Sequence, residues 1–182
     1  MHVAPRYDPL AESAVFPKGM SAQPIVDGTV ARGHLNDDEL LYTGKVNGKP
    51  GETFPFAITA ADLDRGEERY NIYCSPCHGR TGEGNGMVVQ RGYKQAANYH
   101  IDRLRQAPVG HFFEIMTNGF GAMPDYRSQI AVADRWRIVA YIRALQLSHH
   151  ATSADVPDDE MRKLNEGGAT GAVKTGEGGG QE

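Results

Sequence analysis

Apolar and small residues recur at helical spacing after Thr59, which predicts a helix that begins there and runs to about residue 74. Thr59 and Asp62 form the S/T-x-x-D/E pattern of a capped helix start. Gly66 falls in mid-helix, where glycine costs about 1 kcal/mol relative to alanine. That cost indicates that a second helix crosses there at close range. The predicted apolar face consists of Leu63, Gly66, Tyr70, Tyr73 and Cys74.

A second helical stretch runs from about Ile130 to Leu147. Its apolar arc is too wide for a helix that rests on one surface, so we expect it to contact the first helix and a further group. Between the two, Pro108 suits the start of a helix over about 109–117, which Asn118-Gly119 would end. A short helical turn is predicted over 101–106. The apolar arc consists of Val132, Trp136, Ile138, Val139, Ile142 and Leu145.

Residues 1–58 lack such a period, because six of the ten prolines of the chain fall there. We predict an extended N-terminal arm. Asn47-Gly48 favours a short hairpin within it, although Pro50 removes one donor from the ladder. The arm is too aromatic for a plain linker and is expected to pack on the following domain or on partner subunits. Its aromatic residues are Tyr7, Phe16, Tyr42, Phe54 and Phe56.

Residues 151–182 are rich in glycine and acidic side chains and poor in apolar ones, which predicts a disordered tail. The tail holds seven acids and three bases and so accounts for the formal net charge of −4. The rest of the chain is balanced, with 16 acids and 16 bases. This distribution excludes the basic stripe typical of proteins that bind nucleic acid. No apolar run approaches the roughly 18 residues of a membrane span.

The most specific chemistry in the chain lies at Cys74-Ser-Pro-Cys77-His78. The pattern C-x-x-C-H is the attachment signature of c-type haem, in which both thiols form thioether bonds and the histidine becomes an axial ligand of the iron. The chain has no other cysteine, so no disulfide framework is available to stabilise a small domain. A buried porphyrin would supply that core instead.

Two other interpretations of the motif remain open at this point. The thiols could form a dithiol redox pair, or Cys74 and Cys77 could bind zinc with two of His78, His100 and His111. The surrounding sequence favours haem, because the motif closes a helical stretch instead of following a strand. The glycines from Gly82 to Gly86 are interpreted as close approach of the backbone to the haem. Arg80, Arg91, Tyr93 and Lys94 are candidates for binding the haem propionates or for a docking face.

With His78 on one side of the iron, Met123 is the predicted ligand on the other. It lies in a loop between the last two predicted helices, so the chain has room to approach from the opposite face. Met87 is too near the motif, and Met116 is more typical of core filling. His100 and His111 remain alternatives to Met123.

At this point the chain resembles the class I c-type cytochromes, in which the first and last helices cross at a glycine and aromatic residues. The resemblance rests on Gly66, Tyr70, the haem motif, Met123-Pro124, Trp136 and Tyr141. Longer segments are similar to the monohaem cytochrome subunit of bacterial alternative complex III, which oxidises quinol. These segments cover residues 6–10, 28–33, 42–44, 73–87, 100–104 and 108–112.

The resemblance implies an all-α fold of the class I cytochrome c type around one covalent haem c, in a domain over residues 59–150. It implies one-electron transfer by a subunit that is not itself an enzyme, with Cys74, Cys77, His78 and Met123 as the haem-binding residues. A peroxidase or ligand-binding haem is the alternative function. Prolines found in relatives near Ala96-Ala97 are missing here, so the acceptor of the His78 N–H is not predicted.

The resemblance also implies partners and a location. The partners are other subunits of a membrane quinol-oxidising complex and a terminal oxidase or soluble electron carrier. The location is the periplasmic side of a bacterial inner membrane, with a lipid anchor as in related lipoproteins. Met1 to Arg6 lack the layout of a secretory signal, so an export segment and the anchor are expected upstream of Met1.

Overall fold

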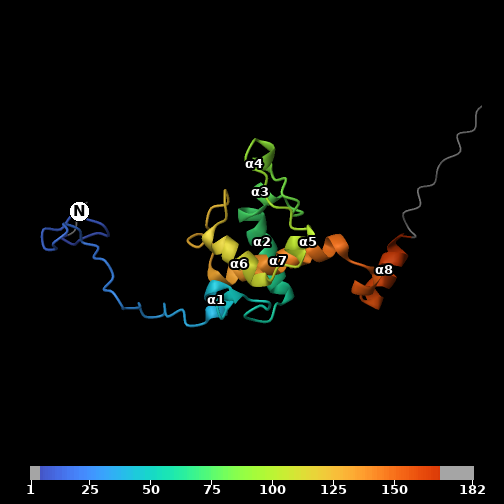
Figure 1. Ribbon diagram of the computed structural model, residues 1–182, viewed down its shortest axis with the longest axis horizontal. Helices are drawn as coiled ribbons and strands as arrows, with labels where there is room; N and C mark the ends of the chain where they lie inside the picture. The colour runs from blue at the N-terminus through green and yellow to red at the C-terminus, as the bar shows by residue number, and fades with distance from the viewer. Residues whose placement is uncertain (1–4, 169–182) are drawn as a thin grey trace, which may run out of the picture. The chain divides into compact units, whose positions relative to one another are not determined.

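The computed structural model describes residues 5–168, and regular structure among them is mostly helical (Figure 1). Contacts divide the chain into two units, Met1–Asp37 and Asp38–Glu182, which are described separately. No helix in the described part of the chain is both long and apolar enough to cross a membrane.

The second unit confirms the four predicted helical segments, which correspond to α2, α5, α6 and α7, with ends that differ by no more than three residues. In chain order, its elements are α1 (Glu39–Thr43), β1 (Lys45–Val46), β2 (Lys49–Pro50), α2 (Ala60–Tyr73), α3 (Ser75–His78), α4 (Met87–Gln90), α5 (Asp102–Arg105), α6 (Val109–Asn118), α7 (Val132–His150), a 3-10 turn (Ser153–Asp155) and α8 (Asp158–Gly168).

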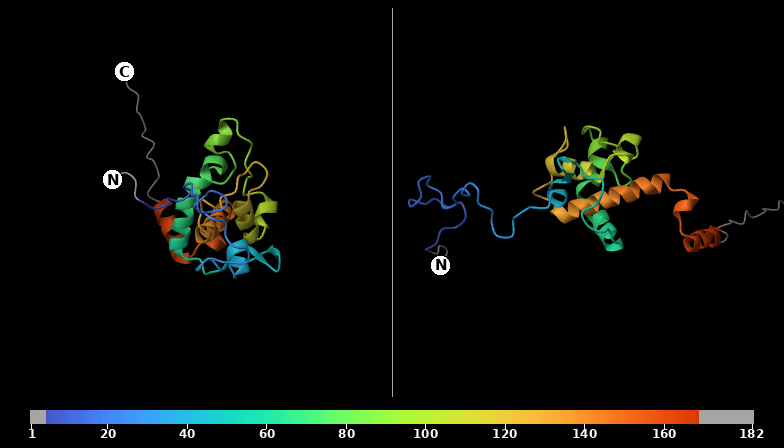
Figure 2. Two further views of the ribbon diagram at one scale, coloured as in Figure 1. Left: turned by 90° about the vertical axis from the view of Figure 1, so that its left-hand side faces the viewer. Right: turned by 60° about the horizontal axis from the view of Figure 1, so that its bottom comes forward.

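Helices α2 and α7 make the most extensive helix contact, and α7 lies across α2 in the ribbon views (Figures 1 and 2). The expected capping box is present, because Thr59 and Asp62 each bond the backbone N–H of the other. The predicted close crossing at Gly66 is also confirmed: a Cβ there would press on the carbonyl oxygen of Arg137 and lie 3.1 Å from Cβ of Tyr141.

Replacement of Gly66 by alanine is therefore expected to lower the free energy of unfolding by about 2 kcal/mol, because the methyl group has no room against the α7 backbone. The better helix propensity of alanine, about 1 kcal/mol, opposes this loss without cancelling it. Urea unfolding followed by circular dichroism measures the change. Asp64→Ala, at an exposed position of α2, is the control and should stay within about 0.5 kcal/mol of the parent. A Gly66→Ala protein as stable as the parent would contradict the tight crossing.

Ion pairs reinforce the α2–α7 contact. Asp62 pairs with Arg137 at 2.8 Å, and Asp134 pairs with Arg65 at 2.9 Å and Arg137 at 3.0 Å. Hydrogen bonds from Thr59 and then Arg137 lower the pKa of Asp62 from 3.8 to about 2. Burial acts to raise the pKa of Asp134, but the hydrogen bonds from Arg65 and Arg137 outweigh it, so that pKa is also lowered.

The lowered pKa of Asp62 predicts a loss of stability in acid. The folded state favours the carboxylate, so its contribution is present above the unfolded pKa of about 4 and is lost as the pH falls toward about 2. Between pH 5 and 2, the melting temperature of the parent should fall more than that of Asp62→Asn. The melting temperature of Asp64→Asn, which keeps the Thr59 and Arg137 contacts of Asp62, should fall as much as that of the parent. If the melting temperatures of all three proteins fell equally between pH 5 and 2, a contribution of Asp62 to the acid sensitivity would be ruled out.

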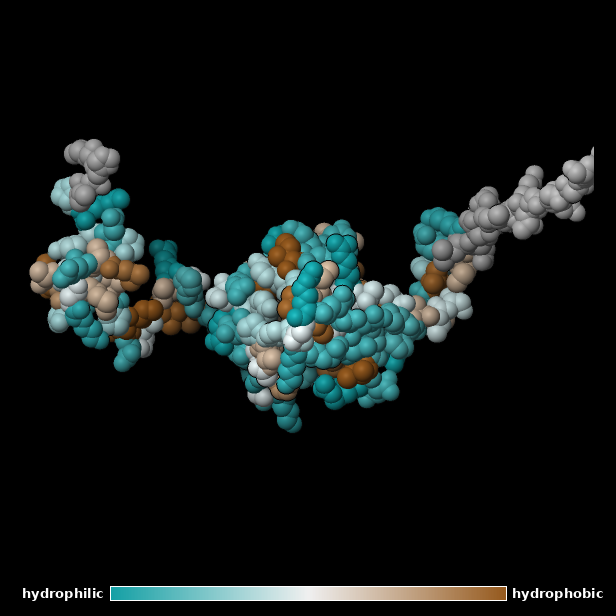
Figure 3. All heavy atoms as spheres, turned by 90° about the horizontal axis from the view of Figure 1, so that it is seen from above, coloured by the Kyte–Doolittle hydropathy of each residue, from teal (hydrophilic) through white to brown (hydrophobic). Residues whose placement is uncertain are grey.

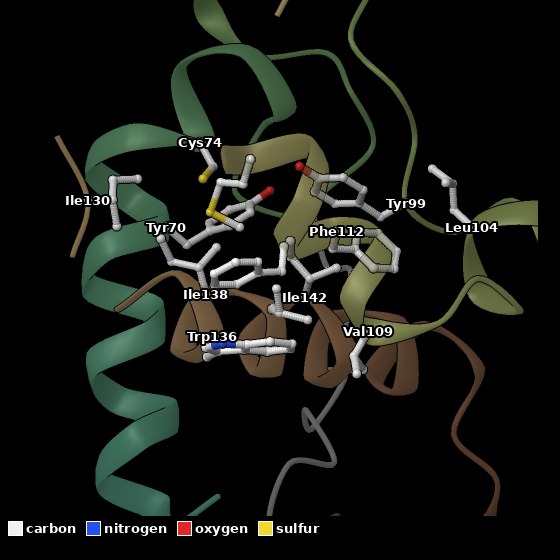
Figure 4. Close-up of a cluster of buried hydrophobic side chains, with 13 residues drawn as sticks. Tyr70, Cys74, Tyr99, Leu104, Val109, Phe112, Ile130, Trp136, Ile138 and Ile142 are labelled. Carbon is white, nitrogen blue, oxygen red and sulfur yellow. The ribbon is translucent and has the colours of Figure 1, made fainter. Parts of the chain in front are cut away.

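The core lies between α2, α6 and α7 (Figure 4). Trp136 of α7 is fully buried and stacks on Phe113 of α6, with ring centroids 4.5 Å apart. Tyr70 of α2 is also fully buried and donates a hydrogen bond from its hydroxyl to the carbonyl of Gly79, at 2.7 Å. The core thus fixes the turn that follows the Cys-x-x-Cys-His motif.

Residues 38–51 pack on the helices, which is one of the two positions expected for the arm, but the prediction that they are extended is wrong for Glu39–Thr43, which form α1. Trp136 donates from Nε1 to the carbonyl of Leu41 at 2.8 Å, and the amide of Gly110 donates to the carbonyl of Gly51 at 2.9 Å. Close approach of Gly44 to Gly110 permits this contact, since a Cβ on either would meet the other's carbonyl oxygen. Buried donors on α6 and α7 thereby gain partners that α-helical bonding alone does not provide.

The predicted hairpin at Asn47-Gly48 is confirmed. Strands β1 and β2 pair antiparallel, with Val46 opposite Lys49. Asn47 and Gly48 both have positive φ, 52° and 73°, as a two-residue type I′ turn requires. The carboxylate of Glu39 accepts hydrogen bonds from both turn amides, each at 2.9 Å.

Two further segments, one in the first unit and one at the end of the second, lie outside the helical core. In residues 5–37 the only regular pairing described is the bridge between Glu12 and Met20, and apolar side chains gather on the surface there (Figure 3). In the predicted disordered tail, residues 158–168 form α8, whose acidic first turn suits the positive end of the helix dipole. Residues 169–182 of that prediction lie outside the described residues.

Candidate haem-binding site

The four residues predicted to bind haem line one cavity of about 470 Å³. Cys74 ends α2, Cys77 and His78 lie in α3, and Met123 comes from the loop between α6 and α7. Figure 4 shows the Cys74 sulfur at the edge of the core, on the side of Tyr70 and Tyr99. The volume falls within the range of about 300–1,000 Å³ typical of small-molecule and cofactor sites. Apolar and aromatic walls include Val88, Tyr99, Leu104, Phe112, Ile115, Met116, Phe120, Tyr126 and Ile142.

The surroundings of His78 favour the neutral imidazole that a metal ligand requires. Its Nδ1 lies 3.1 Å from the carbonyl oxygen of Ala97, which can only accept, so Nδ1 carries the proton and Nε2 keeps its lone pair. Burial lowers the pKa of His78 and outweighs the opposite effect of this hydrogen bond. The ring also stacks on Tyr99, at 4.6 Å between centroids. Ala97 is thus the acceptor that the sequence did not identify.

The glycine-rich loop after the motif has a role different from the one predicted. Gly82, Gly84 and Gly86 do not line the cavity; they pack against protein. A Cβ on Gly84 would meet the carbonyl of Ala96, and one on Gly86 would meet the carbonyl of Pro76. Their amides donate to His78 and Cys77 carbonyls, at 2.8 and 2.9 Å. The loop therefore closes on the backbone of the motif and brings the segment around Ala97 next to His78.

The two thiols are free and differ in their surroundings. Cys74 is buried, and burial raises the pKa of its thiol to about 12. Cys77 is half-buried on the same cavity wall. A buried protonated thiol of high pKa is a poor dithiol reagent, because exchange requires the thiolate. The environment of Cys74 thus disfavours the redox-pair interpretation.

Zinc is disfavoured as well, because no group of three or more His, Cys, Asp or Glu within the described residues could hold a metal ion.

The alternatives to Met123 as the second ligand differ in their positions. The side chain of His100 contacts other partners: its Nε2 donates to the carbonyl of Thr81 at 2.7 Å, and its ring stacks on His149 at 3.9 Å. His100 and Met87 do not line the cavity. His111 and Met116 do, from α6, so they are the side chains against which Met123 must be tested as a ligand.

Met123 is half-buried in a tight loop. Phe120 and Met123 form an isolated bridge, with both backbone bonds at 3.0 Å. Gly119 and Gly121 have positive φ, 78° and 61°, which lets the chain turn there without strain. The Arg127 side chain donates to the carbonyl of Thr117 and to the Asn118 side chain, which anchors the loop to the end of α6.

The charged groups of the cavity wall are two cations, Lys94 and Arg103, and no acidic residue lines it. Neither cation has an ion pair among the described residues. Haem carries two propionate carboxylates, so this charge is complementary to it. Of the sequence candidates, Tyr93 and Lys94 line the cavity and Arg80 and Arg91 do not. Arg103 was not predicted to line the site, because no sequence pattern distinguishes it from other cations on short exposed turns.

These residues fit a haem c group. Cys74 and Cys77 would form the thioether bonds, His78 would ligate the iron through Nε2, and Met123 is the candidate for the other side. Lys94 and Arg103 would neutralise the propionates, while the aromatic wall would exclude water. When bound, the group supplies a reversible one-electron couple.

Residues 61–142, from α2 to α7, match the sequence profile of the family described as cytochrome C oxidase, cbb3-type, subunit III. This region is thus a cytochrome c-type domain with a class I cytochrome c-like helical fold, which implies covalently bound haem c and electron transfer. No curated protein matches the sequence.

Solved structures with similarity include the reducing HAO-like protein complex of Kuenenia stuttgartiensis, at 18% identity and a TM-score of 0.45. That match covers 59% of this chain and 54% of the other, so the chain spans about half of its length. Cytochrome cL from Hyphomicrobium denitrificans is similar at 21% identity and a TM-score of 0.39, over 65% of this chain and 71% of that one.

Proposed function

We propose that the protein is a monohaem c-type cytochrome that relays single electrons as a subunit of a membrane quinol-oxidising complex. The observation that carries the proposal is the shared cavity of Cys74, Cys77, His78 and Met123. With two cysteines in the whole chain, two thioether bonds account for one haem. The cytochrome c-type domain over residues 61–142 supports electron transfer as its chemistry.

The side chains of the cavity favour electron exchange over substrate chemistry. His78 and Met123 would both hold the iron as ligands, so its chemistry would be electron exchange without direct binding of a substrate. The hydrogen bond from His78 Nδ1 to Ala97 holds the imidazole in one orientation and raises its basicity as a ligand. Met123 would raise the reduction potential relative to ligation by two histidines, which suits a carrier that accepts electrons from a quinol-oxidising partner.

The proposed partners are the other subunits of that complex and a terminal oxidase or soluble carrier, at the periplasmic face of a bacterial inner membrane. Apolar side chains exposed on residues 5–37 support a role of this segment in subunit contacts, because exposed apolar residues in such number are typical of interaction surfaces. These residues are Tyr7, Leu10, Val15, Phe16, Met20, Ile25, Val26, Val30 and Leu35. A lipid anchor upstream of Met1 belongs to the same proposal.

The test is reduction of the haem by quinol within the complex purified through this chain. We expect the reduced absorption spectrum to appear on addition of quinol and to be reversed by the oxidase. If quinol leaves the haem oxidised while dithionite reduces it, the quinol-oxidising role is excluded. Carbon monoxide distinguishes the alternative function: binding to the reduced protein at neutral pH would favour a ligand-binding or peroxidase-type haem.

A further inference from the structure

One continuous segment, residues 93–97, forms a wall of the cavity, and all five of its residues line it. The segment has no helix or strand of its own. It is connected at one end to the backbone beside His78 and at the other to the loop that carries Met123. Neither the proposed function nor a sequence pattern assigns a role to this connection.

At the His78 end, the segment makes two hydrogen bonds. The carbonyl of Ala97 accepts from His78 Nδ1 at 3.1 Å. The side-chain amide of Gln95 donates to the carbonyl of Gly84 at 2.7 Å, and the Gly84 amide in turn donates to the His78 carbonyl at 2.8 Å. This end of the segment is therefore fixed to the loop that closes on the haem motif.

At the Met123 end, the hydroxyl of Tyr93 donates to the carbonyl of Ala122 at 2.8 Å. Ala122 lies within the turn closed by the Phe120–Met123 bridge. In the described part of the chain, Tyr93 is the only side chain that hydrogen-bonds to residues 120–123 from outside the loop. The other anchors, made by Arg127 and by the Tyr126 amide, lie at the ends of the loop.

We infer that residues 93–97 act as a strap joining the two sides of the haem site, and that Tyr93 is the positioning residue that keeps Met123 at the iron. The inference rests on the proposed haem ligation. Without the Tyr93 hydroxyl, the turn is anchored only at its base, so the population with Met123 displaced should increase. An added ligand must compete with Met123, and its apparent affinity rises in proportion to that displaced population.

The experiment is titration of the oxidised holoprotein with imidazole, followed by the charge-transfer absorption band of methionine-ligated ferric haem. For Tyr93→Phe we expect about fivefold tighter apparent binding of imidazole than for the parent, which corresponds to about 1 kcal/mol at about 1.4 kcal/mol per tenfold. Haem staining on a denaturing gel should be unchanged. The phenylalanine keeps the ring, so the half-exposed site and the fold are retained.

Tyr73→Phe is the matched control. Tyr73 lines the same cavity, but its hydroxyl lies 3.4 Å from the carbonyl of Gln129, outside the Met123 turn. Its variant should bind imidazole like the parent. Equal affinities for the two variants would overturn the role of Tyr93 and leave the proposed function intact. A parent protein without the methionine band would instead contradict the proposed ligation itself.

A double-mutant cycle tests the strap as a unit. Gln95→Ala removes the side-chain bond to Gly84, so Tyr93 would then be attached to a looser segment. The Tyr93→Phe effect should shrink from about fivefold to less than about twofold in this background, because connected residues are not additive. Full additivity of the two substitutions would show that Tyr93 and Gln95 act separately and would overturn the strap.

Discussion

A protein in which alanine replaces both Cys74 and Cys77 is expected to retain no haem on a denaturing gel. Each thioether bond requires one of these sulfurs, and the chain has no other cysteine that could replace them. Either single replacement leaves one attachment point, so staining should decrease without vanishing. The measurement is haem staining of the protein expressed in a host that matures c-type cytochromes.

The matched control lies inside the same motif. Ser75→Ala removes the hydroxyl that donates to the Asn71 carbonyl at 2.8 Å but keeps both sulfurs, so staining should equal that of the parent. Covalent haem that persists in the double alanine variant would exclude Cys74 and Cys77 as attachment sites. A parent protein that folds but remains colourless in the same host would exclude the haem assignment altogether.

Met123→Leu is expected to leave the haem attached but to change its redox behaviour. Leucine has a similar volume and no sulfur, so the loop can still pack while one iron ligand is lost. We expect the midpoint potential to fall by on the order of 0.1–0.3 V, within the range of about 0.8 V that axial ligation spans. The reduced protein should also bind carbon monoxide. Potentiometry followed by absorption, with and without the gas, measures both effects.

Two other residues of the cavity wall serve as controls for this variant. Met116 is buried on α6 and lines the same cavity, so Met116→Leu should keep the methionine absorption band if Met123 is the ligand. His111→Leu should keep it as well. Loss of the band in Met116→Leu, or unchanged ligation in Met123→Leu, would transfer the assignment to another residue.

Part of the site depends on contacts that no local pattern contains. The His78 acceptor is a backbone carbonyl, and any residue at position 97 offers one. Gly84 and Gly86 were expected to lie close to the haem, because glycine permits close approach of the backbone. The pattern does not identify the group that is approached. In the structure, Gly84 lies against the backbone of Ala96 and Gly86 against that of the haem motif. Tyr93 and Arg103 reach the cavity only because residues 93–105 fold across it.

Features that depend on neighbouring residues could be predicted from the amino-acid sequence. The Thr59 cap, the turn at Asn47-Gly48 and the ends of α6 follow from short-range hydrogen bonding and φ preferences, and the spacing of Cys74, Cys77 and His78 carries its own chemistry. The close helix crossing at Gly66 could also be predicted, since a glycine inside a helix indicates a close neighbour.

Contacts between segments that are distant in the sequence could not be predicted in this way. The bond from Trp136 to Leu41 spans 95 residues, and it places residues 38–51 in the helical unit despite Pro50 and their short elements. The same holds for the cavity, whose walls come from several separate stretches of chain between residues 73 and 142. Such pairings are set by the fit of surfaces and by the need of buried polar groups for partners, and both depend on the whole fold and not on local order.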